Sequence, residues 1–448
     1  MNVVRTIKNI FAISDLRRKL SFTLGVLVIH RLGCHIPVIG INTAKLAETI
    51  AQSGVFGKLL TYLDIFSGGA LSQCTVFALG ISPYITASIM MQILSFTVPE
   101  LEALMKEGEY GKKIINQYTK YLALALSIVY SLGFAFALES KGLVLTPGIG
   151  FKLFFVMSLS VGCMIVMWLG DQVSLFGLGN GSSVIIFSGI VSRFPGYVLR
   201  TITYVQDGIF YHGSLPGINA LIGIGLWAAL IAIMIAIIYL EKGERKISVQ
   251  YARRIIGNRV YGGQGSFIPF KINSVGVMPV ILASAFLQMP KALFGFLSDK
   301  FNFCRIVSEA LVQTTFVYNV LEFVLIVAFY YVYTALIFNP TELADSLKKN
   351  GGFIPGIRPG RKTAEFFDMI LTRLGLVGSM YLAGLALLPN VMMFIVGMER
   401  MPFYLGGTSL LIVVGVALEM GFQIEAYLLE HNYEGFLMSG RLKSRGAR

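Results

Sequence analysis

The residues that most often carry chemistry in proteins are few in this sequence and lack the spacings that chemistry requires. The histidines and cysteines lie far apart, except His30 and His35, which we interpret as packed or interfacial and not as metal ligands. Gly177, Gly179 and Gly181 have the spacing of a dinucleotide loop, but they precede an apolar segment, so we predict a plain turn. We therefore expect no metal, no cofactor and no catalytic residue, and predict that the chain is not an enzyme.

The elements around these residues are apolar. Of 448 residues, 55% are hydrophobic and only 14% are charged, which is too few charges for the surface of a soluble protein of this size. Segments of about 20 apolar residues, each long enough to cross a bilayer, recur along the chain. We expect ten spans, in an all-α polytopic membrane protein, at residues 19–38, 75–98, 119–138, 151–169, 182–199, 218–240, 272–297, 314–338, 370–395 and 404–429.

The orientation follows from the basic residues. Alternate connections together with both termini hold 24 Lys and Arg, counting Lys19 at the start of the first span, and the opposite connections hold 7. Basic connections stay in the cytoplasm, so both termini are predicted to be cytoplasmic. Two long loops on that side, 241–271 and 339–369, are expected to form a docking surface for an acidic or phosphate-rich partner.

Several apolar segments are interrupted. The apolar segment 59–72 is too short to cross a bilayer and has the pair Gly68-Gly69 near its end. It therefore predicts a re-entrant or plugging half-helix beside a cavity. Gly80, Pro83, Pro279, Pro290 and Gly406-Gly407 break other spans, which indicates a pathway. Bulky uncharged side chains lie near these breaks and predict an apolar constriction: Ile81, Ile85, Ile186, Ile281 and Ile412.

Charged residues inside the spans are rare. We expect Arg31, Arg193 and Arg373 to pair with Glu322 or Glu419, or to reach an interface, in structural roles.

Several strings of residues together resemble the SecY family, whose members form the channel subunit of the bacterial Sec translocase. The resemblance extends from the first span to the tail. The matching strings are FSGGALS at 66–72, FALGISPYI at 77–85, GNG at 179–181, FNP at 338–340, FIPGIRPG at 353–360 and PFYLGGTSLLI at 402–412. The resemblance implies ten helices in two pseudo-symmetric five-helix halves around a central pore.

Matching positions imply roles for individual residues. The pore ring would contain Ile81, Ile85, Ser182, Ile186, Ile281 and Ile412. The plug would contain Phe66, Ser67, Gly68, Gly69, Ala70, Leu71 and Ser72. The lateral gate would contain Thr86, Gln92 and Asn273, and the motor or ribosome would dock at Arg253, Arg254 and Arg358. Ser182 departs from the family, which usually has an aliphatic residue there; the alternative role for Ser182 is to cap the fifth helix. Glu322 and the pair Leu175-Phe176 are further departures.

The implied organisation has four parts. These are a cytoplasmic arm (1–18), an N-terminal half (19–200, with the plug near 59–72), a C-terminal half (201–429) and a cytoplasmic tail (430–448). The implied partners are the SecE and SecG subunits, the SecA motor, the ribosome with its nascent chain, signal peptides and translocating polypeptides, anionic lipids and, as accessory partners, SecDF and YidC. The implied location is the bacterial inner membrane, with a plastid thylakoid membrane as the alternative.

The predicted function is a protein-conducting channel that passes unfolded chains and releases apolar segments sideways into lipid. Two other functions fit broken helices less well. A secondary transporter would need a charged or polar substrate site at mid-membrane, and acidic residues are sparse there. A purely structural scaffold would have no use for a plugging half-helix.

Overall fold

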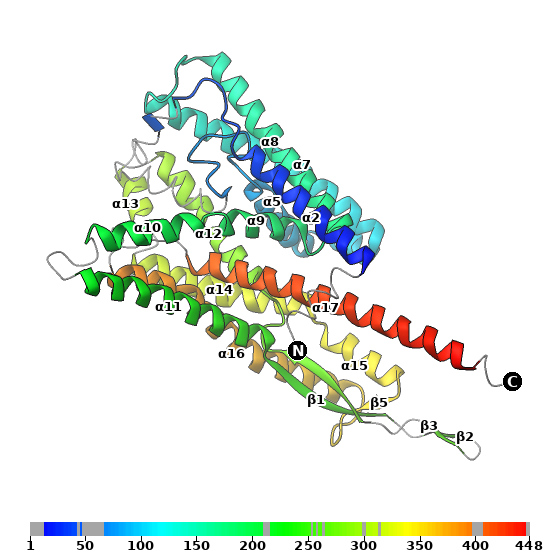
Figure 1. The fold of residues 1–448 in the computed structure, drawn as a ribbon. Helices are drawn as coiled ribbons and strands as arrows, with labels where there is room; N and C mark the ends of the chain where they lie inside the picture. The colour runs from blue at the N-terminus through cyan, green and yellow to red at the C-terminus, as the bar shows by residue number, and fades with distance from the viewer. Residues whose placement is uncertain are drawn as a thin grey trace. The chain divides into compact units, whose positions relative to one another are not determined.

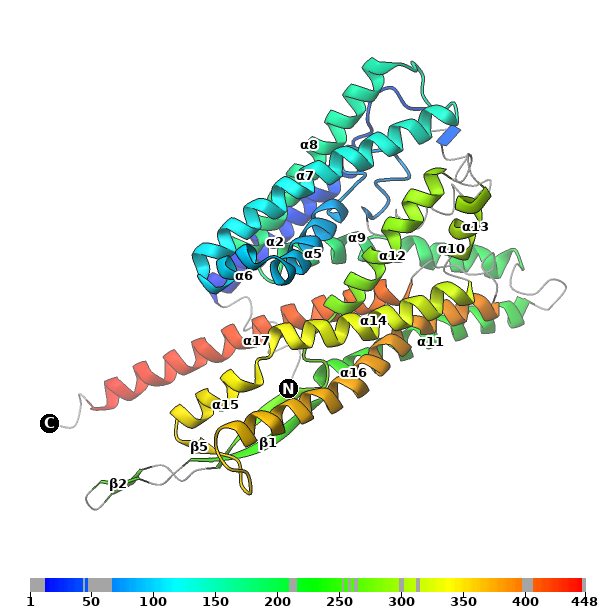
Figure 2. The same cartoon turned by 180° about the vertical axis from the view of Figure 1, so that it is seen from behind.

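The computed structural model describes residues 13–42, 45–46, 67–208, 216–251, 254–256, 259–261, 265–297, 302–311, 315–396 and 406–444, and the structural statements below concern these residues. They are folded mostly as helices (Figures 1 and 2). The chain divides into two compact units, each described by itself. The first unit contains residues 1–199, 292–305 and 416–448, and the second contains residues 200–291 and 306–415.

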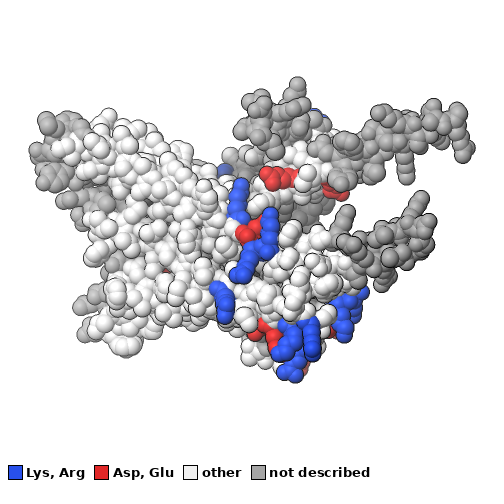
Figure 3. Space-filling model, turned by 90° about the horizontal axis from the view of Figure 1, so that it is seen from below, with Lys and Arg blue, Asp and Glu red and all other residues white. Residues whose placement is uncertain are grey.

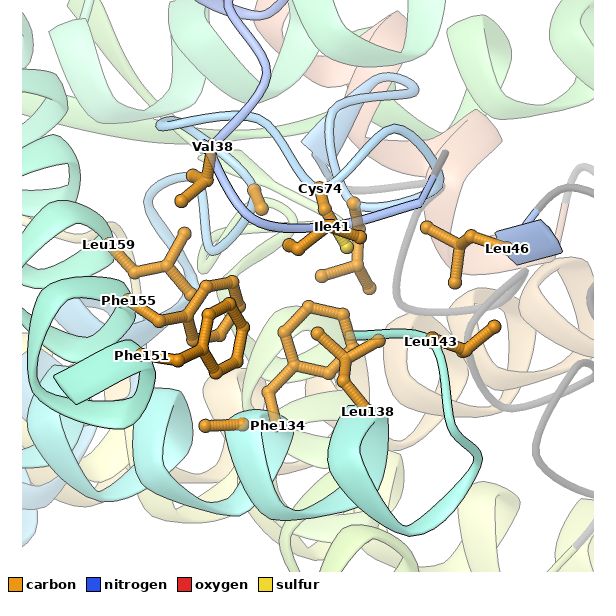
Figure 4. Packing of buried hydrophobic residues seen from close by; sticks show 13 residues of the cluster. Val38, Ile41, Leu46, Cys74, Phe134, Leu138, Leu143, Phe151, Phe155 and Leu159 are labelled. Atoms are coloured by element: carbon orange, nitrogen blue, oxygen red, sulfur yellow. The ribbon is translucent and has the colours of Figure 1, made fainter. Parts of the chain in front are cut away.

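The first unit is built on long helices. Those that lie wholly within it are α2 (Ser14–Gly33), α5 (Ser82–Thr97), α6 (Pro99–Lys106), α7 (Glu109–Ser140), α8 (Ile149–Phe176) and α9 (Gly181–Val191). Helices α7 and α8 pack together through residues spaced three and four apart, which lie on one helix face. Phe134 and Leu138 of α7 meet Phe151 and Phe155 of α8, and the connection that carries Cys74 covers them (Figure 4).

The second unit combines helices with a small sheet. Its helices are α11 (Pro216–Lys242), α14 (Phe316–Ile337), α15 (Pro340–Lys349) and α16 (Arg361–Val396). Its strands are β1 (Glu244–Tyr251), β2 (Arg254–Ile256), β3 (Arg259–Tyr261), β4 (Gly265–Lys271) and β5 (Gly352–Phe353). Four helices have residues in both units: α10 (Phe194–Gln206), α12 (Met278–Leu297), α13 (Asn302–Ala310) and α17 (Gly407–Ser444).

The apolar segments confirm a multi-pass membrane protein. In the part of the chain that the structure describes, seven helical stretches are long and apolar enough to cross a bilayer. The other three expected spans, 19–38, 75–98 and 272–297, correspond to α2, α5 and α12, which do not meet that criterion; α5 has only 16 residues. The count of ten spans therefore stays a prediction.

The surface also fits lipid contact. Large apolar side chains face outward: Leu221 is 73% exposed and Phe316 is 81% exposed. On the face shown in Figure 3 the described charged side chains gather over limited areas, and a broad area is almost entirely without them. A soluble monomer rarely exposes so many large apolar side chains.

Two expected spans have different shapes from those predicted. The span expected at 182–199 is broken, because α9 ends at Val191 and α10 begins at Phe194. Pro195 lacks the N–H that would continue the α9 ladder. The span expected at 75–98 begins as turns, and its helix starts only at Ser82, with Pro83 in the first turn, where its missing N–H costs nothing.

The two long loops contain β structure, which the all-α prediction missed. Strands β1 and β4 form an antiparallel ribbon in which Ile247 faces Ile268, and β5 of the second loop pairs with β1 of the first, Gln250 opposite Phe353. The three-stranded order is β4-β1-β5.

Gly162 of α8 tests the packing of the first unit. A Cβ added there would lie 2.0 Å from the carbonyl oxygen of Val76, whereas a Cβ added at Gly150 of the same helix meets nothing within 4 Å. We expect Gly162→Ala to destabilise the protein by about 1–3 kcal/mol, because backbone has to move. Thermal unfolding of the purified protein in detergent measures the change, with Gly150→Ala as the control. Equal unfolding temperatures for the two variants would contradict the close approach.

Candidate functional site

The predicted plug is described from Ser67 onward; Phe66 and residues 59–65 lie outside the described residues. Ser67 is the only helical residue of this part, and the residues up to Cys74 form turns. Gly68 and Gly69 have φ of +65° and +101°, which favour glycine. The Ser67 hydroxyl accepts a hydrogen bond from the Leu71 N–H at 3.2 Å.

The plug residues are tied into the first unit. Ala70 and Leu71 are buried, and Leu71 belongs to the hydrophobic cluster of Figure 4. The Ala70 carbonyl accepts hydrogen bonds from both the N–H and the hydroxyl of Thr75. Arg31 of α2 donates from Nη1 to the Gly68 carbonyl at 3.1 Å and from Nη2 to the Ser188 carbonyl of α9 at 2.6 Å. Arg31 therefore bonds to backbone carbonyls. Pairing with a carboxylate, one of the two expected alternatives, is not what these bonds show.

Glu322, one of the two glutamates considered as partners for these arginines, lies beside amide side chains. Glu322 of α14 is 1% exposed and accepts a hydrogen bond from Nδ2 of Asn390 at 3.2 Å. The same Nδ2 donates to Asn319 at 3.0 Å. The buried Glu322 thus lies in an amide network between α14 and α16.

Four of the six predicted ring residues lie in the first unit. Ile81 precedes α5 and Ile186 lies on α9, and both are buried, whereas Ile85 and Ser182 are half-buried. A Cβ added at Gly170 of α8 would lie 3.6 Å from Cδ1 of Ile81 and 3.6 Å from the backbone nitrogen of Ser182. The starts of α5 and α9 are therefore close together beside Gly170.

Ser182 does not cap α9, so the alternative role predicted for it is wrong. The N-cap is Asn180, whose Oδ1 accepts from the Ser182 N–H at 3.1 Å and from the Ser182 hydroxyl at 2.6 Å. The turn itself is fixed by the Gly179 N–H, which donates to Oε1 of Gln423 at 2.7 Å. Gly179 has φ of +79° and lies in the connection between α8 and α9, whereas Gly177 caps the end of α8 and Gly181 is already the first residue of α9.

The remaining two ring residues lie in the second unit. Ile412 on α17 is 1% exposed, and Ile281 on α12 is half-buried. A Cβ added at Gly415 would lie 2.8 Å from Cγ1 of Val277, so the two segments approach closely there. Ile412 precedes Gly415 by three residues on α17, so the two share a helix face. The Ile281 N–H donates to the Val277 carbonyl at 3.2 Å, which places Ile281 in the first turn of α12 next to that contact.

The predicted lateral-gate residues are also divided between the units. In the first unit, the Thr86 hydroxyl donates to the Ser82 carbonyl at 3.1 Å, and Gln92 is half-buried. In the second unit Asn273 is buried and its Nδ2 donates to Oε2 of Glu241 at 2.8 Å. Asn273 Oδ1 has no hydrogen-bond partner among the described residues.

The predicted docking loops form one folded body on the second unit (Figures 1 and 2). Ile247, Val249, Phe270, Ile354 and Phe367 bring β1, β4, the second loop and α16 into one hydrophobic cluster. Asn339 caps α15 by accepting from the Thr341 N–H at 3.2 Å, which gives the FNP string a structural role.

Arg358 lies at the exposed tip of the second loop. Gly356 and Gly360 on either side have φ of +82° and +103°. The Thr363 hydroxyl donates a hydrogen bond to the Arg358 carbonyl at 3.0 Å, which fixes the backbone of the tip. Arg361 and Lys362 nearby are paired with Glu365 at 3.3 and 2.8 Å. Arg254 is placed on β2, opposite Tyr261, by its backbone alone, and Arg253 lies outside the described residues.

Solved structures similar in fold define the class of protein. One described as "The structure of a protein conducting channel" gives a TM-score of 0.62 at 19% identity, covering 92% of this chain and 92% of that chain. Another, "Sec61 in the Canine ribosome-channel complex from the endoplasmic reticulum", gives a TM-score of 0.58 at 19% identity over 92% of each chain. The chain therefore has the fold of the protein-conducting channels.

Sequence comparison gives the family. Residues 75–421 match the SecY family. The protein translocase subunit SecY of Pseudomonas aeruginosa is 40% identical, covering 97% of this chain and 96% of that protein. The subunit of the same name from Aquifex aeolicus is 42% identical, covering 96% of this chain and 99% of that protein. This chain belongs to the SecY family, which confirms the prediction of a channel subunit and not an enzyme.

Proposed function

We propose that this chain forms the channel of a protein translocase, passing unfolded polypeptides across a membrane and releasing apolar segments sideways into lipid. The observation that carries the proposal is the 40% identity to a translocase subunit over 97% of the chain. Both termini face the cytoplasm of a bacterial inner membrane in this proposal, because Lys and Arg gather in the connections on that side.

The proposed constriction is the ring of Ile81, Ile85, Ser182, Ile186, Ile281 and Ile412. An apolar collar holds no polar chain and closes to ions by losing its water. In support, the starts of α5 and α9 lie together beside Gly170, and Val277, the residue before α12, approaches Gly415 of α17. The plug at 66–72 closes the resting channel from within.

The proposed lateral exit lies between α5, with Thr86 and Gln92, and α12, which follows Asn273. An apolar segment of about 20 residues gains about 25 cal/mol for each Å² that it removes from water by entering lipid. A polar segment has no such gain and continues through the ring. This difference sorts secreted from membrane segments.

The proposed energy source is external, and its dock is the sheet with Arg253, Arg254 and Arg358. The partners proposed are the SecA motor, the ribosome with its nascent chain, SecE and SecG, with SecDF and YidC as accessory partners and anionic lipids around the basic arm. The exposed Arg358 on a fixed backbone supports a docking role, because a backbone that is already ordered loses little entropy on binding.

Cross-linking tests the channel directly. A photoreactive residue at position 81 or 281 of the assembled translocase should cross-link to a polypeptide arrested during export. Absence of such adducts, together with uptake of a small solute by the reconstituted protein, would favour a transporter instead.

Arg358→Glu should reduce SecA-driven export by about tenfold or more while the protein remains inserted and folded. The substitution turns an attraction at the contact into a repulsion. Arg361→Glu is the matched control, since it reverses a neighbouring charge that is already paired with Glu365. Export assays with inverted membrane vesicles measure both variants. Equal losses in the two would mean that overall charge, and not the tip, is recognised.

Deletion of residues 66–72 should leave a working but leakier channel. These residues block the pore in the proposed function without building its walls. Ion conductance of the complex in planar bilayers and export by the same preparation give the two measurements. Failure of the deleted protein to assemble would show that the segment is structural.

Ser182→Ile should lower the resting ion conductance while export continues. A hydroxyl offers water a hydrogen-bonding partner inside the apolar ring, and isoleucine removes it. Ser183→Ile is the control, because Ser183 is also half-buried on α9 but points about 100° away. Equal or greater leak through Ser182→Ile in single-channel recordings would remove Ser182 from the ring.

A further inference from the structure

Arg31 is the side chain through which helix α2 contacts the plug and α9 at the same time. Its two terminal nitrogens reach the Gly68 carbonyl at 3.1 Å and the Ser188 carbonyl at 2.6 Å. These acceptors lie 37 and 157 residues away in the sequence. The planar guanidinium has several N–H donors in a fixed fork, so one arginine can join two separate backbone segments, which the single ammonium of lysine does less well.

The acceptor on α9 is well suited to a cation. Ser188 belongs to the last turn of α9, where helix carbonyls carry partial negative charge. The Ser188 carbonyl already accepts from the Ser192 N–H at 3.1 Å. Arg31 is thus a second donor to it, and α9 does not need Arg31 in order to end there.

The plug lies against α9 at this point. A Cβ added at Gly68 would be 2.9 Å from the Cα of Gly189 and 2.7 Å from Nη2 of Arg31. Only glycine allows this approach, and Gly68 also has φ of +65°. By contrast, the nearest atom to a Cβ at Gly69 is Nη2 of Arg193, at 3.7 Å.

The contact is also incomplete. Arg31 Nε is buried and has no hydrogen-bond partner among the described residues. A cation in an apolar span is costly, and such residues usually have a function. A fully bonded guanidinium would hold more firmly, so the observed pair of bonds suits a contact that has to open.

We infer that Arg31 is the residue that holds the plug in its resting position, by bridging the Gly68 carbonyl to the end of α9, the helix that carries Ser182 and Ile186. The inference rests on the proposed channel function and adds a residue that the predicted plug and ring do not include. When the plug leaves, the Gly68 bond breaks and the Ser188 bond remains. The cation then stays in place beside α9 while the pore opens.

A cycle of variants in the assembled translocase tests this role by resting ion conductance in planar bilayers without SecA. Arg31→Met keeps an unbranched, flexible side chain and removes its donors, so the leak should rise several-fold toward that of the 66–72 deletion. In the deleted protein, Arg31→Met should add nothing, because there is no plug to hold. Arg31→Lys should leak to an intermediate degree.

The outcomes separate the two proposals. If the deletion itself does not leak, the proposed plug fails, and this inference fails with it. If the deletion leaks but Arg31→Met does not, only the holding role is overturned. An equal increase from Arg31→Met with and without the plug would show that Arg31 supports the walls, which also overturns it.

A second pair of variants keeps the test decisive where Arg31→Met does not assemble. Gly68→Ala and Gly69→Ala both strain a backbone with positive φ, but only alanine at 68 meets the Arg31 guanidinium and Gly189. Gly68→Ala should therefore leak several-fold more than Gly69→Ala. Equal leaks would mean that backbone strain alone releases the plug, and the holding role would be wrong.

Discussion

Backbone that leaves the helical path inside a membrane must find all its hydrogen bonds within the protein, because hydrocarbon offers none. The segment from Ser67 to Gly80 finds bonds of this kind in its own turns. The N–H groups of Cys74, Thr75, Ala78 and Gly80 reach carbonyls inside the same run of turns, and the Val76 N–H reaches the Ile36 carbonyl at 3.0 Å. The Val38 N–H returns a bond to the Cys74 carbonyl at 2.9 Å. Side chains add further bonds: the Ser67 hydroxyl accepts from the Leu71 N–H, the Thr75 hydroxyl donates to the Ala70 carbonyl, and Arg31 donates to the Gly68 carbonyl. The non-helical part of the first unit therefore depends on a few side chains as well as on its own backbone.

The same requirement explains where glycine and proline occur in the broken segments. Positive φ at Gly68, Gly69 and Gly80 lets the chain turn within a short distance. Pro83 begins α5 at a position whose N–H would have no helical partner. In their described residues, the strings at 66–72 and 77–85 that indicated the family are thus places where the backbone departs from a regular span.

Much of the fold follows from the sequence because it depends on local pattern. The apolar runs around 119–138 and 151–169 became α7 and α8, extended at both ends beyond the hydrophobic residues. The break between α9 and α10 was missed, although Pro195 signals it. The β1–β4 ribbon was also missed, although Ile247 and Val249 alternate with exposed residues as a half-buried strand does.

What the sequence does not predict are contacts between distant segments. The partners of Arg31 are carbonyls, which every residue has, so no residue type identifies them. The pairing of β5 with β1 joins residues about a hundred positions apart through two backbone strands. The candidate site shares this limit. Five of the six ring residues were predicted from their place beside breaks in the spans, and Ser182 from resemblance alone, but their burial ranges from fully buried to half-buried without a pattern that one sequence reveals.

The β1–β4 ribbon is closed at its membrane end as well as along its length. The Ile272 N–H donates to the Gly243 carbonyl at 2.8 Å, and Asn273 is held by Glu241 at the end of α11. Because the ribbon is hydrogen-bonded at its base, a force applied at its tip would act on residues 243 and 272. Helix α12 begins only a few residues after residue 272, and α11 ends just before residue 243. A partner that presses on the ribbon would thus apply mechanical work to α11 and α12 without touching either helix.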